Sequence, residues 1–111
     1  MHFCITGQYT PRAVKNLLDN PTQNRAEAAR KMAEAAGGKL LSFYGMPAEG
    51  PGVLAIFDVP EPSSAAAIAG LVVAADTLQN VKLMRLLTQE EVVQVRQQAN
   101  KLKAAYSPPG T

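Results

Sequence analysis

GGKLLSFYGMPAEGPGVLAIFDV, residues 37–59, is the stretch that decides the fold. Within it, Lys39–Met46 and Val53–Val59 are rich in the aliphatic and aromatic residues that favour strands. Between them, Pro47–Gly52 holds two prolines and two glycines in six residues, which is typical of a turn. The near-continuous apolar run of Val53–Val59 predicts a central strand that is buried on both faces.

The segment before this hairpin has the features of one or two helices. Thr10 followed by Pro11 combines a hydroxyl N-cap with proline at the first helical position. Asn20 and Pro21 repeat that start signal, so the helix is either kinked or restarted there. Thr22–Ala36 is helical by propensity, and its alanines recur at a spacing of three and four residues. Such an alanine face lets a helix lie close to a sheet, and the two glycines that follow end the helix.

A further helix is expected after the hairpin, where Pro60-Glu61-Pro62-Ser63-Ser64 has the composition of a helix start. Its stretch Ala65–Ala75 is apolar on almost all sides, as in a helix that is covered on two sides. The side expected to face the core carries Ile68, Leu71, Val72 and Ala75. The opposite side is either a small exposed apolar area or a subunit interface, and a membrane contact is the least favoured alternative because the helix lacks lysine and arginine. The candidate interface residues are Ala66, Gly70, Val73 and Ala74.

Two further strands and a last helix complete the chain. His2–Tyr9 alternates between polar and apolar residues, and Gln79–Leu87 does the same, so both are predicted strands. Thr88 with Glu91 three residues later is a capping box, which opens a helix from Gln89 to about residue 105. In the last strand Arg85 shares a face with apolar residues, so we expect it to extend to solvent or to pair with an acid such as Asp58 or Glu61.

The order of elements is β-α-β-β-α-β followed by an extra helix, which is the ferredoxin-like plan of an α+β fold. We expect one domain over residues 1–106 and a disordered tail over 107–111. The helices should cover one face of an antiparallel sheet. The other face, expected to carry Leu40, Leu54 and Ile56, then needs a partner. Two sheets stacked from two chains would hide it, giving a homodimeric α/β barrel or a higher homo-oligomer.

Short motifs along the chain resemble the GYD-domain family over roughly residues 1–91. They are Tyr9-Thr10, Lys15-Asn16, Asp19-Asn20-Pro21, Gly37-Gly38-Lys39-Leu40, Ser42-Phe43-Tyr44, Leu54-Ala55-Ile56, Val59-Pro60 and Asn80-Val81. The resemblance implies a ferredoxin-like fold of the dimeric α/β-barrel type in a family without a generally established reaction. The Gly-Tyr-Asp signature of that family should precede the third strand, where this chain reads Glu49-Gly50-Pro51-Gly52. This chain has neither the tyrosine nor the aspartate at that place, so the roles that these residues have in relatives cannot be assigned to it.

Composition excludes several classes of protein. The net charge of +2, from 11 basic and 9 acidic residues without a basic stripe, argues against nucleic-acid binding. The longest apolar run is about half the length that spans a bilayer, so no membrane role is expected. A single cysteine, Cys4, and an N-terminus without signal-peptide features lead us to expect a cytoplasmic protein.

The sequence contains no motif of nucleophilic catalysis, nucleotide binding or metal binding. His2 and Cys4 can share a strand face, but two ligands are too few for a zinc site within one chain. We therefore expect no metal and no cofactor, and Cys4 is interpreted as a buried inert thiol rather than a nucleophile. Catalytic residues remain unassigned, and whether the chain is an enzyme stays open.

The best candidate site is the sheet face away from the helices. Candidate ligand-binding residues are Cys4, Thr6, Gln8, Ser42 and Tyr44 on that face, with Arg12 and Asp58 at its rim. By analogy with related barrels they would hold a small hydrophobic or aromatic ligand, or else they hydrogen-bond across a dimer interface. The leading hypothesis is an interaction or assembly protein. The alternative is a small-molecule binder or cofactor-independent enzyme acting inside the barrel, and a weaker third is a metal- or nucleotide-binding regulatory module.

Overall fold

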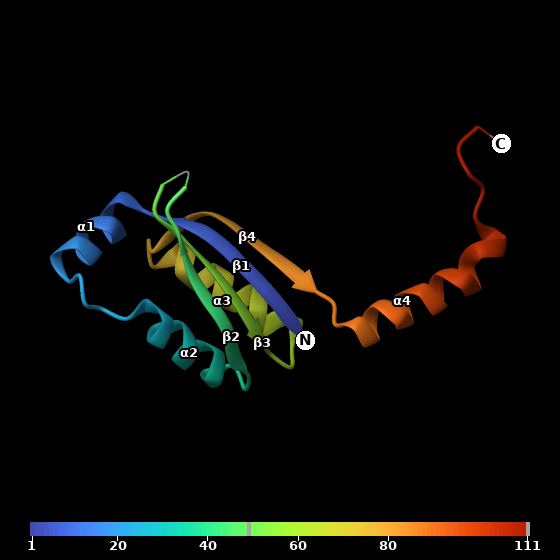
Figure 1. The fold of residues 1–111 in the computed structure, drawn as a ribbon, viewed down its shortest axis with the longest axis horizontal. Helices are drawn as coiled ribbons and strands as arrows, with labels where there is room; N and C mark the ends of the chain where they lie inside the picture. The colour runs from blue at the N-terminus through green and yellow to red at the C-terminus, as the bar shows by residue number, and fades with distance from the viewer. Residues whose placement is uncertain (49, 111) are drawn as a thin grey trace.

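A computed structural model describes residues 1–48 and 50–110 of the chain. The elements, in order, are β1 (His2–Tyr9), α1 (Pro11–Asp19), α2 (Arg25–Ala35), β2 (Lys39–Met46), β3 (Gly52–Asp58), α3 (Pro62–Ala74), β4 (Leu78–Leu86), α4 (Gln89–Leu102) and the 3-10 turn η1 (Lys103–Ala105). The strands form one antiparallel sheet in the order β2-β3-β1-β4 (Figure 1). This order, with β1 and β3 in the centre, confirms the predicted α+β ferredoxin-like fold.

The N-terminal helical segment is interrupted rather than kinked. Thr10 caps α1, because its Oγ1 accepts a hydrogen bond from the Ala13 amide at 3.1 Å and donates one to the Asp76 carbonyl at 2.6 Å. The chain leaves helical geometry at Asn20, and α2 begins only after Asn24, whose side chain accepts from the Glu27 amide at 3.1 Å. The second helix therefore starts later than the predicted Thr22, at the next residue able to cap it.

The end of α2 is a Schellman motif. Gly37 has a φ of +83°, and its amide donates to the Glu34 carbonyl at 2.9 Å. The Gly38 amide donates to the Ala33 carbonyl at 2.9 Å. This turn directs the chain into β2, and it places the Cα of Gly38 against the backbone of Asp58, where a Cβ would overlap the carbonyl oxygen.

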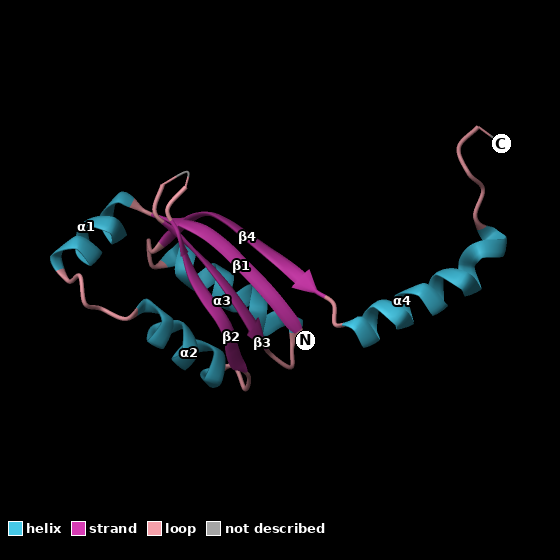
Figure 2. Cartoon of the chain, in the orientation of Figure 1, coloured by secondary structure: helices cyan, strands magenta, loops and turns pink. Residues whose placement is uncertain are grey.

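The core lies between the sheet and the helices α2 and α3. Figure 2 shows the strands as one layer with α3 behind it, and α2 lies against β2 and β3 while α3 lies against β4. Phe3 and Phe57 stack at the centre with ring centroids 6.0 Å apart. The buried cluster consists of Phe3, Ile5, Ala33, Ala55, Phe57, Val59 and Ala65. Of its three alanines, Ala33 comes from α2, Ala55 from β3 and Ala65 from α3. These small side chains let the two helices pack closely on the sheet.

A β-bulge in β2 corrects one expectation about the sheet faces. Leu40 pairs with Phe57, but the next pair is Ser42 with Ile56, so Leu41 is an extra residue. Leu40 therefore lies on the helix side of the sheet and packs against the core. The prediction that Leu40 lies on the opposite face was wrong, because strict alternation fails across a bulge.

Two burial predictions also need correction. Val53 and Ala55 of β3 are buried on the helix side, but Leu54 and Ile56 on the other face are only partly buried. A single chain thus buries one face of β3, not both. Leu71 of α3 was expected to face the core, yet it is 54% exposed.

The C-terminal helix α4 extends away from the rest of the chain (Figure 1). Its capping box is present as predicted, with Thr88 Oγ1 accepting from the Glu91 amide at 3.2 Å. No residue of α4 is buried, and the chain measures 60 × 34 × 21 Å. Among the described residues, no helix combines the length and apolarity needed to cross a bilayer.

Candidate functional site

The sheet face away from the helices, called here the open sheet face, carries five of the predicted site residues. Cys4 pairs with Ile56 and Met84, and Thr6 pairs with Leu54 and Lys82. Residues directly opposite one another in antiparallel strands share a face. The pairs Ser42–Ile56, Tyr44–Leu54 and Gln8–Gly52 extend the same face, so the structure brings together Cys4, Thr6, Gln8, Ser42 and Tyr44.

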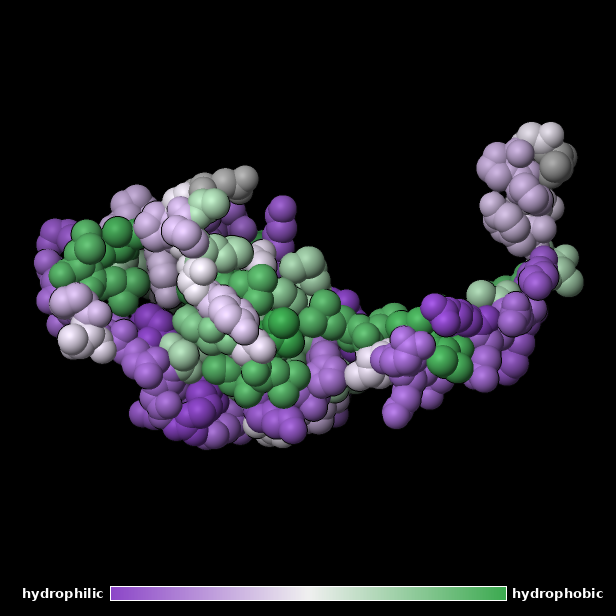
Figure 3. All heavy atoms as spheres, viewed as in Figure 1, coloured by the Kyte–Doolittle hydropathy of each residue, from purple (hydrophilic) through white to green (hydrophobic). Residues whose placement is uncertain are grey.

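Apolar side chains dominate the open sheet face. Leu54 and Ile56 are half-buried, Met84 is 42% exposed and Tyr44 is 63% exposed. Figure 3 shows a hydrophobic area over the sheet that continues toward the start of α4. Cys4 lies at the centre and is only 6% exposed. Burial raises the pKa of its thiol, which keeps it protonated and supports its interpretation as an inert residue.

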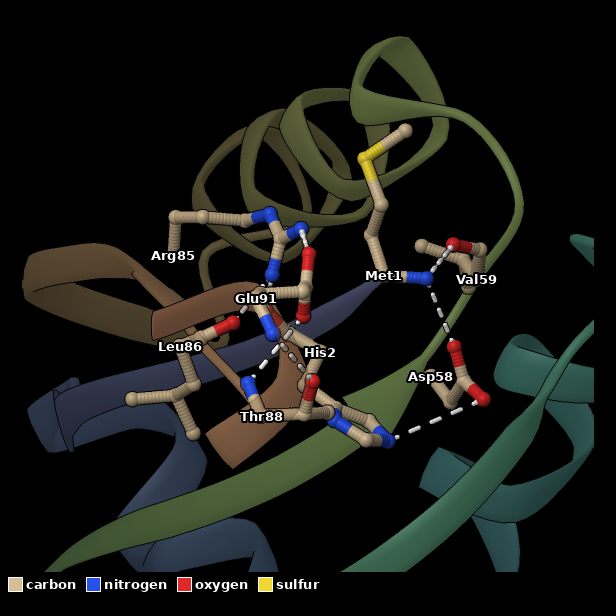
Figure 4. A network of polar contacts seen from close by, with 8 residues as sticks. All are labelled: Met1, His2, Asp58, Val59, Arg85, Leu86, Thr88 and Glu91. Carbon is tan, nitrogen blue, oxygen red and sulfur yellow. Dashed lines mark hydrogen bonds and ion pairs between the residues drawn. The ribbon is translucent and has the colours of Figure 1, made fainter. Parts of the chain in front are cut away.

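The two residues predicted for the rim, Asp58 and Arg12, lie at opposite ends of β1. Asp58 accepts a hydrogen bond from the N-terminal ammonium of Met1 at 2.8 Å, and its other oxygen is 3.8 Å from Nε2 of His2 (Figure 4). The hydrogen bond from that ammonium is the main cause that lowers the pKa of Asp58. Arg12 belongs to α1, beyond the other end of the strand, and faces a different hollow. The two side chains do not form one site.

Arg85 pairs with an acid, which is one of the two alternatives predicted, but the acid is Glu91 and not Asp58 or Glu61. Its guanidinium binds the Glu91 carboxylate (Figure 4). It also lies over the Phe3 ring, 5.6 Å from the centroid. Glu91 also accepts a hydrogen bond from the Thr88 amide at 3.1 Å. The short connection between β4 and α4 brings the first turn of the helix to Arg85, which fixes the base of α4 against the sheet.

This junction predicts a specific response to pH. The hydrogen bond from Arg85 is the main cause that lowers the pKa of Glu91 to about 2, from an ordinary value of 4.5. A carboxyl group whose pKa is lower in the folded state than in the unfolded state stabilises the fold at pH values above its ordinary pKa. This stabilisation is lost as the pH falls through the folded-state pKa. Thermal unfolding between pH 5 and pH 2 should therefore depend less on pH in Glu91→Gln than in the wild type. Glu90→Gln is the matched control and should keep the wild-type dependence, whereas equal profiles for all three proteins would contradict the assignment.

Two adjoining hollows on the helix side of the sheet were not predicted from the sequence. A half-open hollow of about 180 Å³, called here the inner chamber, lies between the sheet, α2 and α3, with walls that include Ala29, Met32 and Ile68. An outer chamber of about 440 Å³ adjoins it beside α1, lined in part by Arg12 and Asp76. The alanine spacing of α2 was interpreted only as close packing against the sheet, whereas the small side chains also leave space between α2 and α3.

The outer face of α3 is apolar and uncovered. The predicted interface residues Ala66, Gly70, Val73 and Ala74 are all exposed. Val73 is 52% exposed, and Leu71 beside it is 54% exposed. Within residues 1–48 and 50–110, no group of three or more His, Cys, Asp or Glu side chains is placed to hold a metal ion.

Comparison with models of protein families finds a match that covers most of the chain. A family model described as the GYD domain matches residues 3–95. The chain belongs to the GYD-domain family. The match takes in the whole sheet, α1 to α3 and the first half of α4, and it confirms the resemblance drawn from the sequence. No curated protein matches the chain.

The stretch in which this GYD domain departs from the family signature is the β2–β3 turn. Glu49 lies outside the described residues. Gly50 has a φ of +97°, and a Cβ at Gly52 would overlap the backbone of Gly7, so both glycines are required by the backbone. The Pro51 carbonyl accepts a hydrogen bond from the Tyr9 amide at 2.9 Å, which ties the turn to the end of β1. The described part of this turn therefore has a structural role.

Proposed function

We propose that this GYD domain is a self-associating interaction protein, whose dimer forms by stacking the open sheet faces of two copies. The observation that carries the proposal is the apolar surface around Leu54, Ile56 and Met84, which is partly exposed and which no described segment of the single chain covers. Contiguous apolar patches on a sheet face are typical of protein interfaces. A twofold dimer needs only one such surface, because the same patch serves both copies.

The distribution of polarity on the open sheet face favours a second copy as its occupant. The apolar side chains of Ile56 and Met84 flank the buried Cys4, Thr6 lies next to them on the same strand as Cys4, and Lys82 and Asp58 lie toward the edges of the face. An apolar centre with a polar rim is the usual anatomy of a protein–protein interface. The polar groups on the face, such as Thr6 and Ser42, can hydrogen-bond across the interface.

The size of the sheet indicates that α4 also takes part. Four strands of about eight residues present a flat projection of roughly 500 Å². A standard interface buries about 800 Å² on each partner. Helix α4, with 14 residues, is about 21 Å long and could supply the difference.

The apolar stripe of α4 is as uncovered as the sheet. Val95 is 54% exposed and Leu102 is 58% exposed, and Val92 and Ala99 complete the stripe. Tyr106 was expected to continue the stripe, but it lies beyond the end of the helix, after η1, and is 68% exposed. Isolated helices of about 12–15 residues are marginal in water, so α4 needs packing against an apolar surface. We infer that the stripe of each copy packs on its partner beside the stacked sheets. Assembly beyond the dimer would then use the outer face of α3.

Charging the stripe tests this part of the proposal. The double variant Val95→Lys with Leu102→Lys should raise the dissociation constant of the dimer by about a hundredfold, since each buried apolar side chain contributes about 1.5 kcal/mol or more. Sedimentation velocity over a dilution series measures this constant. The matched control, Gln94→Lys with Gln97→Lys, adds the same charge to the opposite side of α4 and should leave the constant unchanged. Equal effects of the two double variants would exclude the stripe from the interface.

A further inference from the structure

We propose that the inner and outer chambers on the helix side form one binding site for a small amphipathic organic acid. The apolar body of the acid lies in the inner chamber, and its carboxylate lies at Arg25. The site is on the opposite side of the sheet from the open sheet face, so it is independent of the proposed dimer. It also differs from the barrel site expected from the sequence.

The inner chamber sets the size and polarity of the guest. Its volume of about 180 Å³ lies between the alanine face of α2, the apolar side chains of the sheet and Val72 of α3. An apolar cavity of about 150 Å³ is large enough to bind benzene. Unfilled apolar space lowers stability in proportion to its volume, so a guest that fills it binds by burial and dispersion. A single aromatic ring or a chain of about six carbons fits this space.

The junction between the chambers supplies the donors for an anion. Tyr9, Arg25 and Thr77 line both chambers, so they lie where one opens into the other. Burial raises the pKa of the Tyr9 hydroxyl, and this outweighs the opposing charge and hydrogen bond of Arg25. Tyr9 is therefore a neutral phenol that can donate a hydrogen bond. A guanidinium beside a phenol and a hydroxyl is a donor set suited to a carboxylate.

The outer chamber makes the charge at this junction positive. Its charged lining consists of two cations, Arg12 and Arg25, and one carboxylate, Asp76. The other polar side chains that line it are the neutral Asn16, Asn20, Gln23 and Thr77, apart from the Tyr9 phenol. The net positive charge favours an anionic head group over a neutral or cationic one. Arg12 thus lies beside a candidate ligand, although not at the rim of the open sheet face where the sequence placed it.

Isothermal titration calorimetry on the full chain tests the site with phenylpropionate and, as a neutral isostere, phenylpropionamide. The wild type should bind the acid with a Kd of about 1 mM or tighter and the amide more weakly. Arg25→Gln should weaken binding of the acid by about tenfold or more, because it removes the charged donor. Arg96→Gln on α4 removes the same charge away from the chambers and should bind as the wild type does.

A cavity-filling variant separates loss of the site from loss of the fold. Ala29→Leu should abolish binding of the acid, while the thermal unfolding midpoint stays at or above the wild-type value because the leucine fills the inner chamber. Absence of binding to the wild type would overturn the proposal. So would equal affinities for acid and amide, undiminished binding by Arg25→Gln, or undiminished binding by Ala29→Leu. A monomeric variant that still binds the acid would show that the site is independent of self-association.

Discussion

Replacing Ile56 with lysine should convert the proposed dimer into a monomer. Ile56 lies between Cys4 and Ser42 in the middle of the open sheet face. In a stacked dimer, each copy would bury a lysine ammonium group at this position. Neither neighbour, Cys4 or Ser42, carries a carboxylate that could pair with it. An unpaired buried charge costs several kcal/mol, so the dissociation constant should rise by about a thousandfold or more. Light scattering coupled to size exclusion should show the molar mass falling from about twice 11.8 kDa to 11.8 kDa.

Leu18→Lys is the matched control for this substitution. Leu18 is 74% exposed on α1, away from the open sheet face, so the same change of residue type should leave the mass unchanged. Far-UV circular dichroism should be alike for both variants, because the folded monomer already exposes part of Ile56. A dimer that persists in Ile56→Lys would mean that the two copies do not meet through this face.

Gly38→Ala should destabilise the fold by about 2–3 kcal/mol. The added Cβ would overlap the carbonyl oxygen of Asp58, which belongs to β3 and cannot move without breaking the sheet. The β2–β3 pairing and the end of α2 meet at this point, so the strain is transmitted to both. Urea denaturation followed by circular dichroism measures the change in the free energy of unfolding.

Gly70→Ala provides the opposite case. Nothing lies within 4 Å of a Cβ built at Gly70, which is in the middle of α3. This substitution should stabilise the fold by about 0.5–1 kcal/mol, because alanine loses less backbone entropy than glycine in a helix. Should Gly38→Ala prove as stable as the wild type, the close approach of Gly38 to the backbone of Asp58 described above would be incorrect.

The parts of the fold that follow from local chemistry could be predicted from the sequence. Thr10 with Pro11 and Thr88 with Glu91 start helices by bonds within one turn of the chain. Gly37 and Gly38 end a helix in the same local way. The order of these elements was then sufficient to predict the ferredoxin-like fold.

Features that depend on distant contacts could not be predicted. The bulge at Leu41 is visible only once the partner strand is known, so the face of Leu40 was misassigned. The pairing of Arg85 with Glu91 depends on how α4 leaves the sheet. The two chambers were missed because α2 and α3 lie over different strands, and neither segment alone indicates a gap between them.

The central claim is that a second copy covers the open sheet face. Sedimentation equilibrium of the wild-type chain over a wide range of concentration measures this most directly. We predict a molar mass of about twice 11.8 kDa that falls only on dilution. A constant mass of 11.8 kDa up to the highest concentration would contradict the claim.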